Sequence, residues 1–247
     1  MATFVLVPGM WLGGWVWRRV SDRLRAAGHA TYPVTLTGLG ERAHLAGPGV
    51  TLDTHIADLL NLLAFERITD VVLVGHSYAG VPVRGVADRA AERLRRVVYV
   101  DSGPLPDGMA QFDTNPPDAQ PLIRDQVERD GRGYLLPPPS WDPAEDPVNL
   151  AGLGDDDLAL LRGFSVGHPF GTATQPLDLA TADQPPSTLL TCTFPVDHVR
   201  SMIEAGHPFF AGVDRARTNL CELKTGHWPM LSEPAALADL LVEIAAG

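Results

Sequence analysis

A serine on a tight turn is the strongest chemical signal in this sequence. Ser77 lies in the stretch GHSYAG at residues 75–80, between an apolar run at 71–74 and a helix-compatible segment at 81–90. A serine between a strand and a helix exposes its hydroxyl beside main-chain N–H groups that can stabilise an oxyanion. Ala79 stands where a second glycine is usual, and Gly80 follows it. The stretch predicts a nucleophile elbow with Ser77 as the nucleophile.

A serine hydroxyl needs a base within hydrogen-bond reach before it can act as a nucleophile. Of the eight histidines, His227 is the best placed, because it follows the last predicted strand and precedes the closing helix. His198 and His207 are rivals, but they lie in a segment that is typical of a helix leading away from the site. His76 is expected to face the other side of the turn, and His168 lies in a Pro-rich segment. We therefore predict His227 as the base.

Two aspartates are candidates for the acid that orients the imidazole. Asp197 follows a predicted strand at 188–192 and precedes His227, which gives the known triad order Ser, Asp, His. Asp101 ends the preceding predicted strand and could also reach the imidazole. We prefer Asp197 as the acid and keep Asp101 as the alternative; a third interpretation is that Asp197 only caps the helix after it.

An oxyanion hole needs two N–H donors. One is the amide of Tyr78, which follows the nucleophile at a helix N-terminus. The second is expected from the loop after the first strand, where Pro8 has no N–H and Gly9 permits an unusual turn. The amide of Met10 is therefore the predicted second donor. This loop lacks the lysine of a phosphate-binding loop and the full dinucleotide spacing.

Apolar runs alternate with helical patterns along most of the chain, which predicts an α/β fold with a mostly parallel sheet. Six strands are expected, at residues 3–7, 30–35, 70–74, 96–100, 188–192 and 218–223. Helices are expected at 15–27, 53–65, 81–90 and 234–245. The carboxyl ends of parallel strands share one edge, so loops that carry function gather there.

Residues 103–186 interrupt this alternation of predicted strands and helices, and they contain 14 of the 22 prolines. We predict a core at 1–102 and 187–247 with this segment inserted as a cap that carries helices at 119–130 and 155–162. The acidic run at 155–157 is interpreted as a helix start rather than a metal site. The cap is expected to select substrate without supplying an essential catalytic group. Aromatic residues predicted to form an apolar substrate pocket are Trp11, Tyr78, Trp141, Phe164 and Trp228.

The composition limits the classes of function. The chain has 247 residues, 19 Lys and Arg against 30 Asp and Glu, and a formal net charge of −11. This balance, without a basic stripe, disfavours nucleic-acid binding. No apolar stretch is long enough to span a bilayer and no secretory leader is recognisable, so a cytoplasmic protein without a membrane partner is expected. Cys192 and Cys221 are expected to be apolar thiols. No metal-ligand spacing occurs, so neither a metal nor another cofactor is predicted.

With these residues placed, the chain resembles the α/β-hydrolase superfamily, and within it small bacterial carboxylesterases related to plant methylesterases and hydroxynitrile lyases. The resemblance covers nearly the full length and is carried by the segments FVLVPG at 4–9, GGW at 13–15, TLTGLGER at 35–42, the elbow, Gly226-His227 and Met230-Leu231. It implies the same roles for Ser77, Asp197 and His227 and for the amides of Met10 and Tyr78.

The sequence also departs from that family. Pro8 stands where many relatives carry histidine, and Gly9 and Trp228 stand where hydroxynitrile lyases carry threonine and lysine, so cyanohydrin chemistry is disfavoured. In the segment at 38–42, a turn in which Glu41 and Arg42 hold the loop by ion pairs is preferred over substrate contact.

The expected function is hydrolysis of a carboxylic ester, such as a methyl ester or lactone, of an apolar small molecule through an acyl-enzyme. One alternative is a non-hydrolytic tailoring reaction on the same triad: cyclisation, elimination or C–C cleavage. Another is a ligand receptor without enzymatic activity, which an intact triad disfavours. A homodimer is one assembly that the sequence leaves open. Fold alone does not decide between the two enzymatic alternatives.

Overall fold

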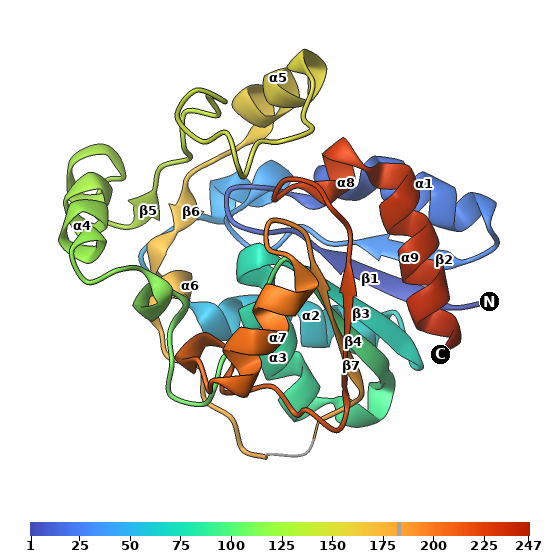
Figure 1. The fold of residues 1–247 in the computed structure, drawn as a ribbon. Coiled ribbons are helices and arrows are strands. Elements are labelled where there is room, and N and C mark those ends of the chain that lie inside the picture. The colour runs from blue at the N-terminus through green and yellow to red at the C-terminus, as the bar shows by residue number, and fades with distance from the viewer. Residues whose placement is uncertain (182–183) are drawn as a thin grey trace.

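The computed structural model describes residues 1–181 and 184–247. Six strands form one sheet in the order β2-β1-β3-β4-β7-β8, and every neighbouring pair in it is parallel (Figure 1). Their bounds are β1 (Thr3–Val7), β2 (Ala30–Pro33), β3 (Val71–His76), β4 (Leu94–Val100), β7 (Ser187–Thr191) and β8 (Thr218–Glu222). The predicted six-stranded sheet is confirmed.

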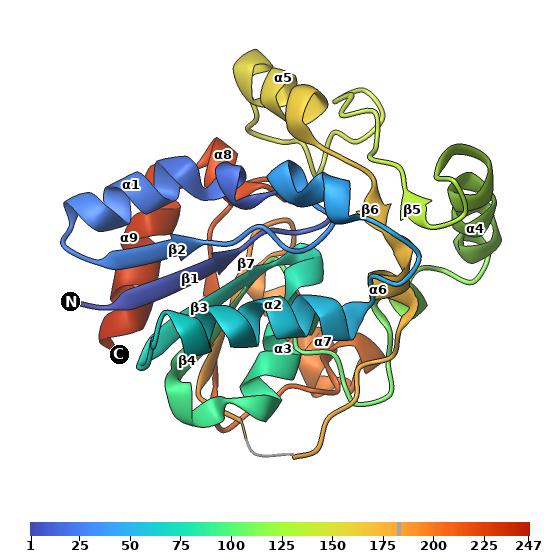
Figure 2. The same cartoon turned by 180° about the vertical axis from the view of Figure 1, so that it is seen from behind.

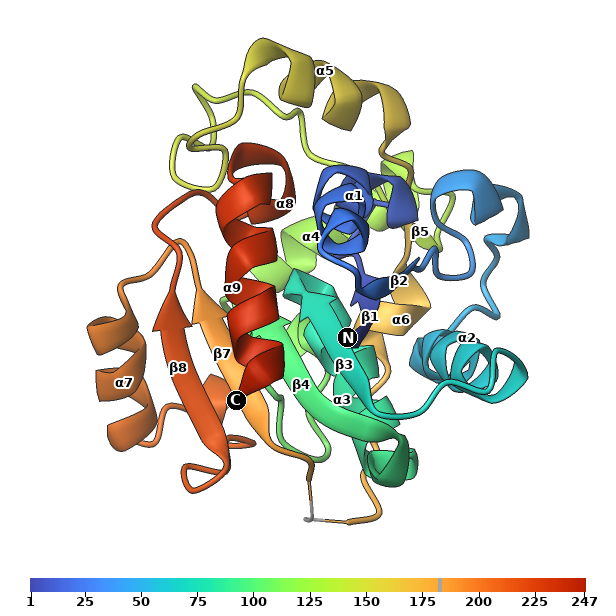
Figure 3. The same ribbon diagram turned by 90° about the vertical axis from the view of Figure 1, so that its right-hand side faces the viewer.

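Helices cover both faces of this sheet, because its central strands are apolar on both sides. The helices α1 (Arg18–Ala26) and α9 (Pro234–Ala246) pack on one face, and α2 (Leu52–Phe65) and α3 (Gly80–Arg89) on the other (Figure 3). Buried residues of β1 alternate between the two cores: Val5 and Val7 belong to the α2 and α3 side, and Phe4 and Leu6 to the α1 and α9 side. The remaining core helices are α7 (Val196–Glu204) and α8 (Pro229–Ser232).

Residues 103–186 form the part of the chain that the sequence predicts as a cap. The elements are α4 (Ala119–Asp130), β5 (Leu135–Leu136), α5 (Asp155–Phe164), β6 (His168–Pro169) and α6 (Phe170–Thr174). Most of them lie beyond the carboxyl ends of β1 and β3 (Figures 1 and 2). Leu105 and Leu177, near the two ends of the segment, are buried in the core on the α2 and α3 side. The division into core and cap stays a prediction.

The acidic run at 155–157 begins α5, as predicted. Asp157 accepts a hydrogen bond from the N–H of Gly154 (3.2 Å) and pairs with Arg19 (2.6 Å), so its carboxylate helps to start the helix and joins the predicted cap to α1.

Both cysteines are free; Cys192 is buried and Cys221 is half-buried. Over the described ranges, none of the helices has the length and apolar character needed to cross a membrane.

Candidate active site

Ser77 lies on a strained turn between β3 and α3. β3 ends at His76, a 3₁₀ turn covers Ser77–Ala79, and α3 begins at Gly80. Ser77 has φ of 53°, in the left-handed region that non-glycine residues rarely adopt. Ala79 has φ of −60°, which an alanine adopts without strain, so the usual second glycine is not required there. The predicted elbow is present, and the Ser77 side chain is partly accessible.

The imidazole of His227 is hydrogen-bonded to the carboxylate of Asp101, with 2.6 Å between Nδ1 and Oδ2. Asp101 follows β4 and is nearly buried, whereas His227 lies in the loop between β8 and α8. Because a carboxylate only accepts, Nδ1 carries the proton and Nε2 is left free to act as a base.

The carboxylate of Asp101 is also held by three donor groups of Cys192 and Thr193. Oδ1 accepts the N–H of Cys192 (2.9 Å) and the N–H of Thr193 (3.1 Å), and Oδ2 accepts the hydroxyl of Thr193 (2.9 Å). Burial disfavours the charged form, but the hydrogen bond and charge of His227 and the two N–H donors outweigh it and lower the pKa of Asp101. The carboxylate is therefore ionised and fixed.

The preference for Asp197 over Asp101 is corrected by this geometry. Asp197 lies in the first turn of α7, its side chain is 92% exposed, and its carboxylate is 3.8 Å from Arg200. After β7 ends at Thr191, α7 begins at Val196 and directs residue 197 to solvent, whereas Asp101 directly follows β4. The acid beside His227 is thus the alternative that the sequence left open.

His227 is also held through its main chain. Its N–H donates to the oxygen of Asn149 (2.7 Å), and its own oxygen accepts from Nε2 of His76 (2.6 Å). The N–H of Gly226 donates to the oxygen of Ala151 (3.2 Å). His76 therefore does not only pack under the turn, and the predicted cap contacts the loop of the base.

The loop after β1 lies against the elbow, as an oxyanion hole requires. A Cβ placed on Gly9 would lie 2.9 Å from Nδ1 of His76 and 3.1 Å from Cβ of Ser77, so a side chain there would push the loop and the elbow apart. Met10 follows directly, and Tyr78 is the second residue of the turn that begins at Ser77, where N–H groups have no helical acceptor. Both predicted donors stand in the expected segments.

The side chain of Tyr78 is fixed below the elbow by a buried polar group. Its hydroxyl lies 2.8 Å from Nδ1 of His55, whose Nε2 is 2.9 Å from the oxygen of Thr37. Burial lowers the pKa of His55 to about 4, so this imidazole is neutral. The ring of His168 packs edge-on to Tyr78, with 4.6 Å between the ring centroids. The side chain of Tyr78 is therefore buried and held by a hydrogen bond and by ring contacts.

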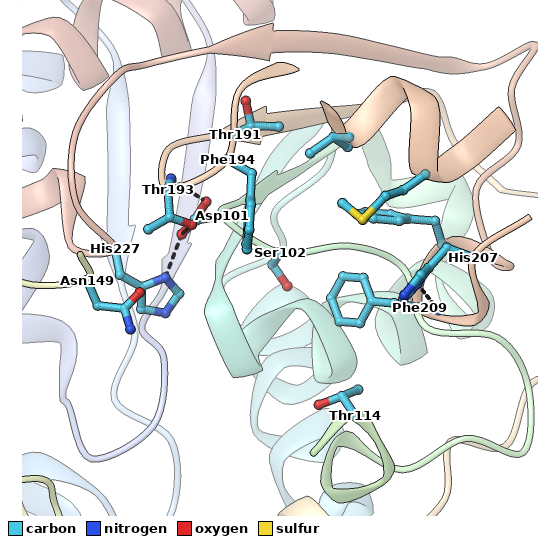
Figure 4. Close-up of a pocket in the computed structure, with 13 residues that line it drawn as sticks. Asp101, Ser102, Thr114, Asn149, Thr191, Thr193, Phe194, His207, Phe209 and His227 are labelled. Carbon is cyan, nitrogen blue, oxygen red and sulfur yellow. Dashed lines mark hydrogen bonds and ion pairs between the residues drawn. The ribbon is translucent and has the colours of Figure 1, made fainter. Parts of the chain in front are cut away.

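A cavity of about 410 Å³ opens beside His227 (Figure 4). Asp101, Ser102 and His227 lie on its wall, together with aromatic and aliphatic side chains from the segment that includes α7 and the 3₁₀ turn Pro208–Phe210. The full lining is Asp101, Ser102, Thr114, Asn149, Thr191, Thr193, Phe194, Val199, Met202, His207, Phe209, Phe210 and His227.

Ser77 is joined to this wall through Ser102, whose hydroxyl donates to the main-chain oxygen of Ser77 (2.6 Å). Within the described residues, Oγ of Ser77 makes no hydrogen bond to His227, a contact that often forms only with substrate bound.

A sequence profile of the Alpha/beta hydrolase family matches residues 4–240. The chain belongs to this family. Over 102 residues it is 53% identical to a carbendazim hydrolyzing esterase from Nocardioides sp. (strain SG-4G); the match covers 41% of this hydrolase and 42% of that protein, less than half of either chain. It is 27% identical to Methylesterase 7 of Arabidopsis thaliana over 268 residues, covering 98% and 95% of the two chains.

Among solved structures, the hydrolase is similar to an extracellular alpha/beta-hydrolase from a Paenibacillus species. The TM-score is 0.80 at 20% identity, with 98% of each chain covered. This likeness shows the shared fold.

The aromatic residues that the sequence assigned to substrate do not line the cavity beside His227. Trp141 and Trp228 are buried against each other, with ring centroids 5.0 Å apart, and both border a different space of about 300 Å³. Trp11 donates to the oxygen of Leu136 and packs edge-on to Trp141. Phe164 is 57% exposed and packs on Trp15. These contacts join the predicted cap to the core of the hydrolase, and the assignment of the four residues to substrate binding stays a prediction.

Sequence reasoning missed the residues that do line the cavity, among them Phe194, Met202, Phe209 and Phe210. One signal was available: Phe194 follows β7, and the pair Phe209-Phe210 follows Pro208 in the next connection, on the side of the sheet where the triad candidates gather.

The predicted turn at 38–42 is partly confirmed, because Arg42 donates to the oxygen of Thr35 (2.9 Å) and pairs with Asp58 (3.2 Å). Glu41 is exposed. No cluster of three or more His, Cys, Asp or Glu side chains in the described part of the hydrolase is arranged to hold a metal ion.

Proposed function

We propose that this hydrolase cleaves carboxylic esters of apolar small molecules through an acyl-enzyme on Ser77. The observation that carries the proposal is the 2.6 Å hydrogen bond from His227 to Asp101 next to a serine at the strained elbow. In this mechanism Nε2 of His227 takes the proton from Oγ of Ser77 as the hydroxyl attacks the ester carbonyl. Asp101 keeps the imidazole in the required tautomer and stabilises the imidazolium.

The tetrahedral oxyanion would be stabilised by the amides of Met10 and Tyr78, and its collapse releases the alcohol with the proton from His227. Water then attacks the acyl-enzyme, with His227 again as the base, and releases the acid. The cavity beside His227 offers apolar walls for one part of the substrate, which supports aryl or other apolar esters.

The relatives favour hydrolysis over the tailoring alternative, because the matched proteins are named as esterases. The identity to the Nocardioides protein also makes carbendazim a candidate substrate for this chain. A cytoplasmic location, the absence of a cofactor and a homodimer stay predictions from the sequence.

The test is labelling with a fluorophosphonate probe followed by peptide mapping, together with turnover of p-nitrophenyl esters and of carbendazim. Labelling at Ser77 and turnover in the parent are expected, with a loss of about 10⁴-fold or more in kcat in Ser77→Ala. Turnover in Ser77→Ala within about tenfold of the parent would exclude covalent catalysis. Labelling without hydrolysis of any ester would favour the tailoring alternative.

A further inference from the structure

His76 connects the nucleophile elbow to the loop of the base. It is the last residue of β3, directly before Ser77, and is 1% exposed. Its Nε2 lies 2.6 Å from the main-chain oxygen of His227, and the two imidazole rings are 4.7 Å apart between centroids. His76, the residue before the nucleophile, is therefore in direct contact with His227, the base.

The partner of His76 fixes its tautomer. A carbonyl oxygen only accepts a hydrogen bond, so Nε2 of His76 carries the proton and Nδ1 carries none. Burial and the neighbouring His227 lower the pKa of His76 to about 3. His76 is therefore neutral. It does not compete with His227 as a base, and it does not repel the imidazolium when His227 is protonated.

Packing alone does not account for an imidazole at this position. Nδ1 of His76 is buried with no hydrogen-bond partner among the described residues, and a Cβ on Gly9 would lie 2.9 Å from it. Burying an unpaired polar atom is unfavourable, and an apolar side chain of similar size would avoid that cost. The feature of His76 that an apolar residue lacks is the Nε2–H donor.

We propose that His76 is a positioning residue, whose Nε2–H holds the main-chain oxygen of His227 and so sets the base relative to Ser77. The inference rests on the proposed function. Asp101 fixes the ring of His227 from the side of β4, and the oxygen of Asn149 fixes its N–H from the cap segment. The bond from His76 is the anchor that comes from the residue directly before the nucleophile, so it relates the two reacting side chains most directly.

The test compares His76→Gln, His76→Asn and His76→Leu. The amide nitrogen of glutamine reaches about as far as Nε2 of histidine, that of asparagine stops near the position of Nδ1, and leucine fills space without a donor. Turnover of p-nitrophenyl acetate and the rate of fluorophosphonate labelling at Ser77 are measured for each, with thermal unfolding as the control for folding.

His76→Gln is expected to keep kcat within about fivefold of the parent, whereas His76→Asn and His76→Leu lose about 10- to 100-fold with little change in KM, since misplacement of a catalytic group acts on kcat. If His76→Leu does not fold, the Gln and Asn variants, which carry the same amide, still decide the outcome.

Equal kcat and labelling rates in the three variants would show that His76 only fills space, and so would an equal loss in Gln and Asn. Such a result with rapid labelling of the parent would overturn this inference and leave the proposed function standing. A parent that is not labelled at Ser77 would overturn both.

Discussion

The hydrogen bond between Asp101 and His227 joins the ends of two strands, β4 and β8, that are not neighbours in the sheet. Asp101 follows β4 and His227 follows β8, and β7 lies between these two strands in the sheet. The residues after β7 take part in a different way, because the N–H groups of Cys192 and Thr193 donate to the carboxylate of Asp101. The residues after β7 thus do not supply the acid; they supply N–H donors that hold the carboxylate of Asp101.

This arrangement gives the first prediction. Asp101→Asn is expected to lower kcat by about 10³- to 10⁴-fold, because the imidazole of His227 loses the partner that sets its tautomer. Turnover of a p-nitrophenyl ester measures the loss, and circular dichroism checks that the variant is folded.

The matched control is Asp197→Asn, which changes an exposed carboxylate that lies 3.8 Å from Arg200. Its kcat is expected to stay within about twofold of the parent, since exposed ion pairs contribute little. A severe loss in Asp197→Asn with a mild one in Asp101→Asn would restore the assignment that the sequence favoured.

The two aspartates show where sequence reasoning ends. Both follow apolar runs that are strands in the structure, and the runs themselves were predictable from hydrophobic patterning. Which of them reaches His227 depends on the first turn of α7, which directs Asp197 outward, and on φ of 44° at Asp101, which the one-dimensional pattern does not encode. The strained turn at Ser77 and the place of His227 after the last strand were predictable because each is a local pattern.

The cavity was not predictable for a similar reason. Trp141 and Phe164 are aromatic residues of the predicted cap, yet one is buried in the core and the other lies on the surface. Their surroundings are set by contacts with residues distant in the chain, such as Trp228 and Trp15. Residue type predicted an apolar pocket, but the fold decides which residues line it.

The second prediction uses two phenylalanines of similar exposure. Phe194 lines the cavity beside His227 and is 53% exposed, whereas Phe164 is 57% exposed and lies elsewhere. Phe194→Ala is expected to lower kcat/KM for a bulky aryl ester by about 5- to 50-fold, because substrate loses apolar contact area. Phe164→Ala should leave it within about twofold.

Kinetics with p-nitrophenyl acetate complete this comparison. The small ester is expected to lose less than the bulky one in Phe194→Ala, since it covers less of the cavity wall. Equal losses for both esters, or a larger loss in Phe164→Ala, would contradict the assignment of the cavity to substrate.

The third prediction concerns acid stability. Burial lowers the pKa of His55 from 6.5 to about 4 in the folded state, despite the raising effects of Thr37 and Asp58. Between these values the unfolded chain binds the proton and the folded chain does not, so the free energy of unfolding falls as pH falls from 6.5 toward 4. One such group accounts for up to about 3 kcal/mol of this loss.

Chemical denaturation of the parent and of His55→Gln between pH 7 and pH 4.5 measures the effect. His55→Gln is expected to be less stable at pH 7 but to lose less stability than the parent on acidification. The slope does not vanish in His55→Gln, because burial also lowers the pKa of His76 and His168. An unchanged slope in His55→Gln would show that His55 does not titrate as described.

The last prediction tests whether the cap segment holds the base in place. A Cβ on Gly226 would overlap the main-chain oxygens of Asn149 and Ala151, which accept the N–H groups of His227 and Gly226. Backbone at both sides of the contact leaves no flexible side chain to move aside, so Gly226→Ala must displace the loop that carries His227. A shift of about 1 Å in a catalytic group costs on the order of 10²-fold in rate, and kcat is expected to fall by about this factor.

Gly163→Ala is the matched control, because a Cβ there meets nothing within 4 Å and the residue lies inside α5. That variant should keep the parent kcat and gain up to about 1 kcal/mol of stability. Parent-like turnover in a folded Gly226→Ala variant would mean that the loop of His227 does not depend on its contacts with the cap.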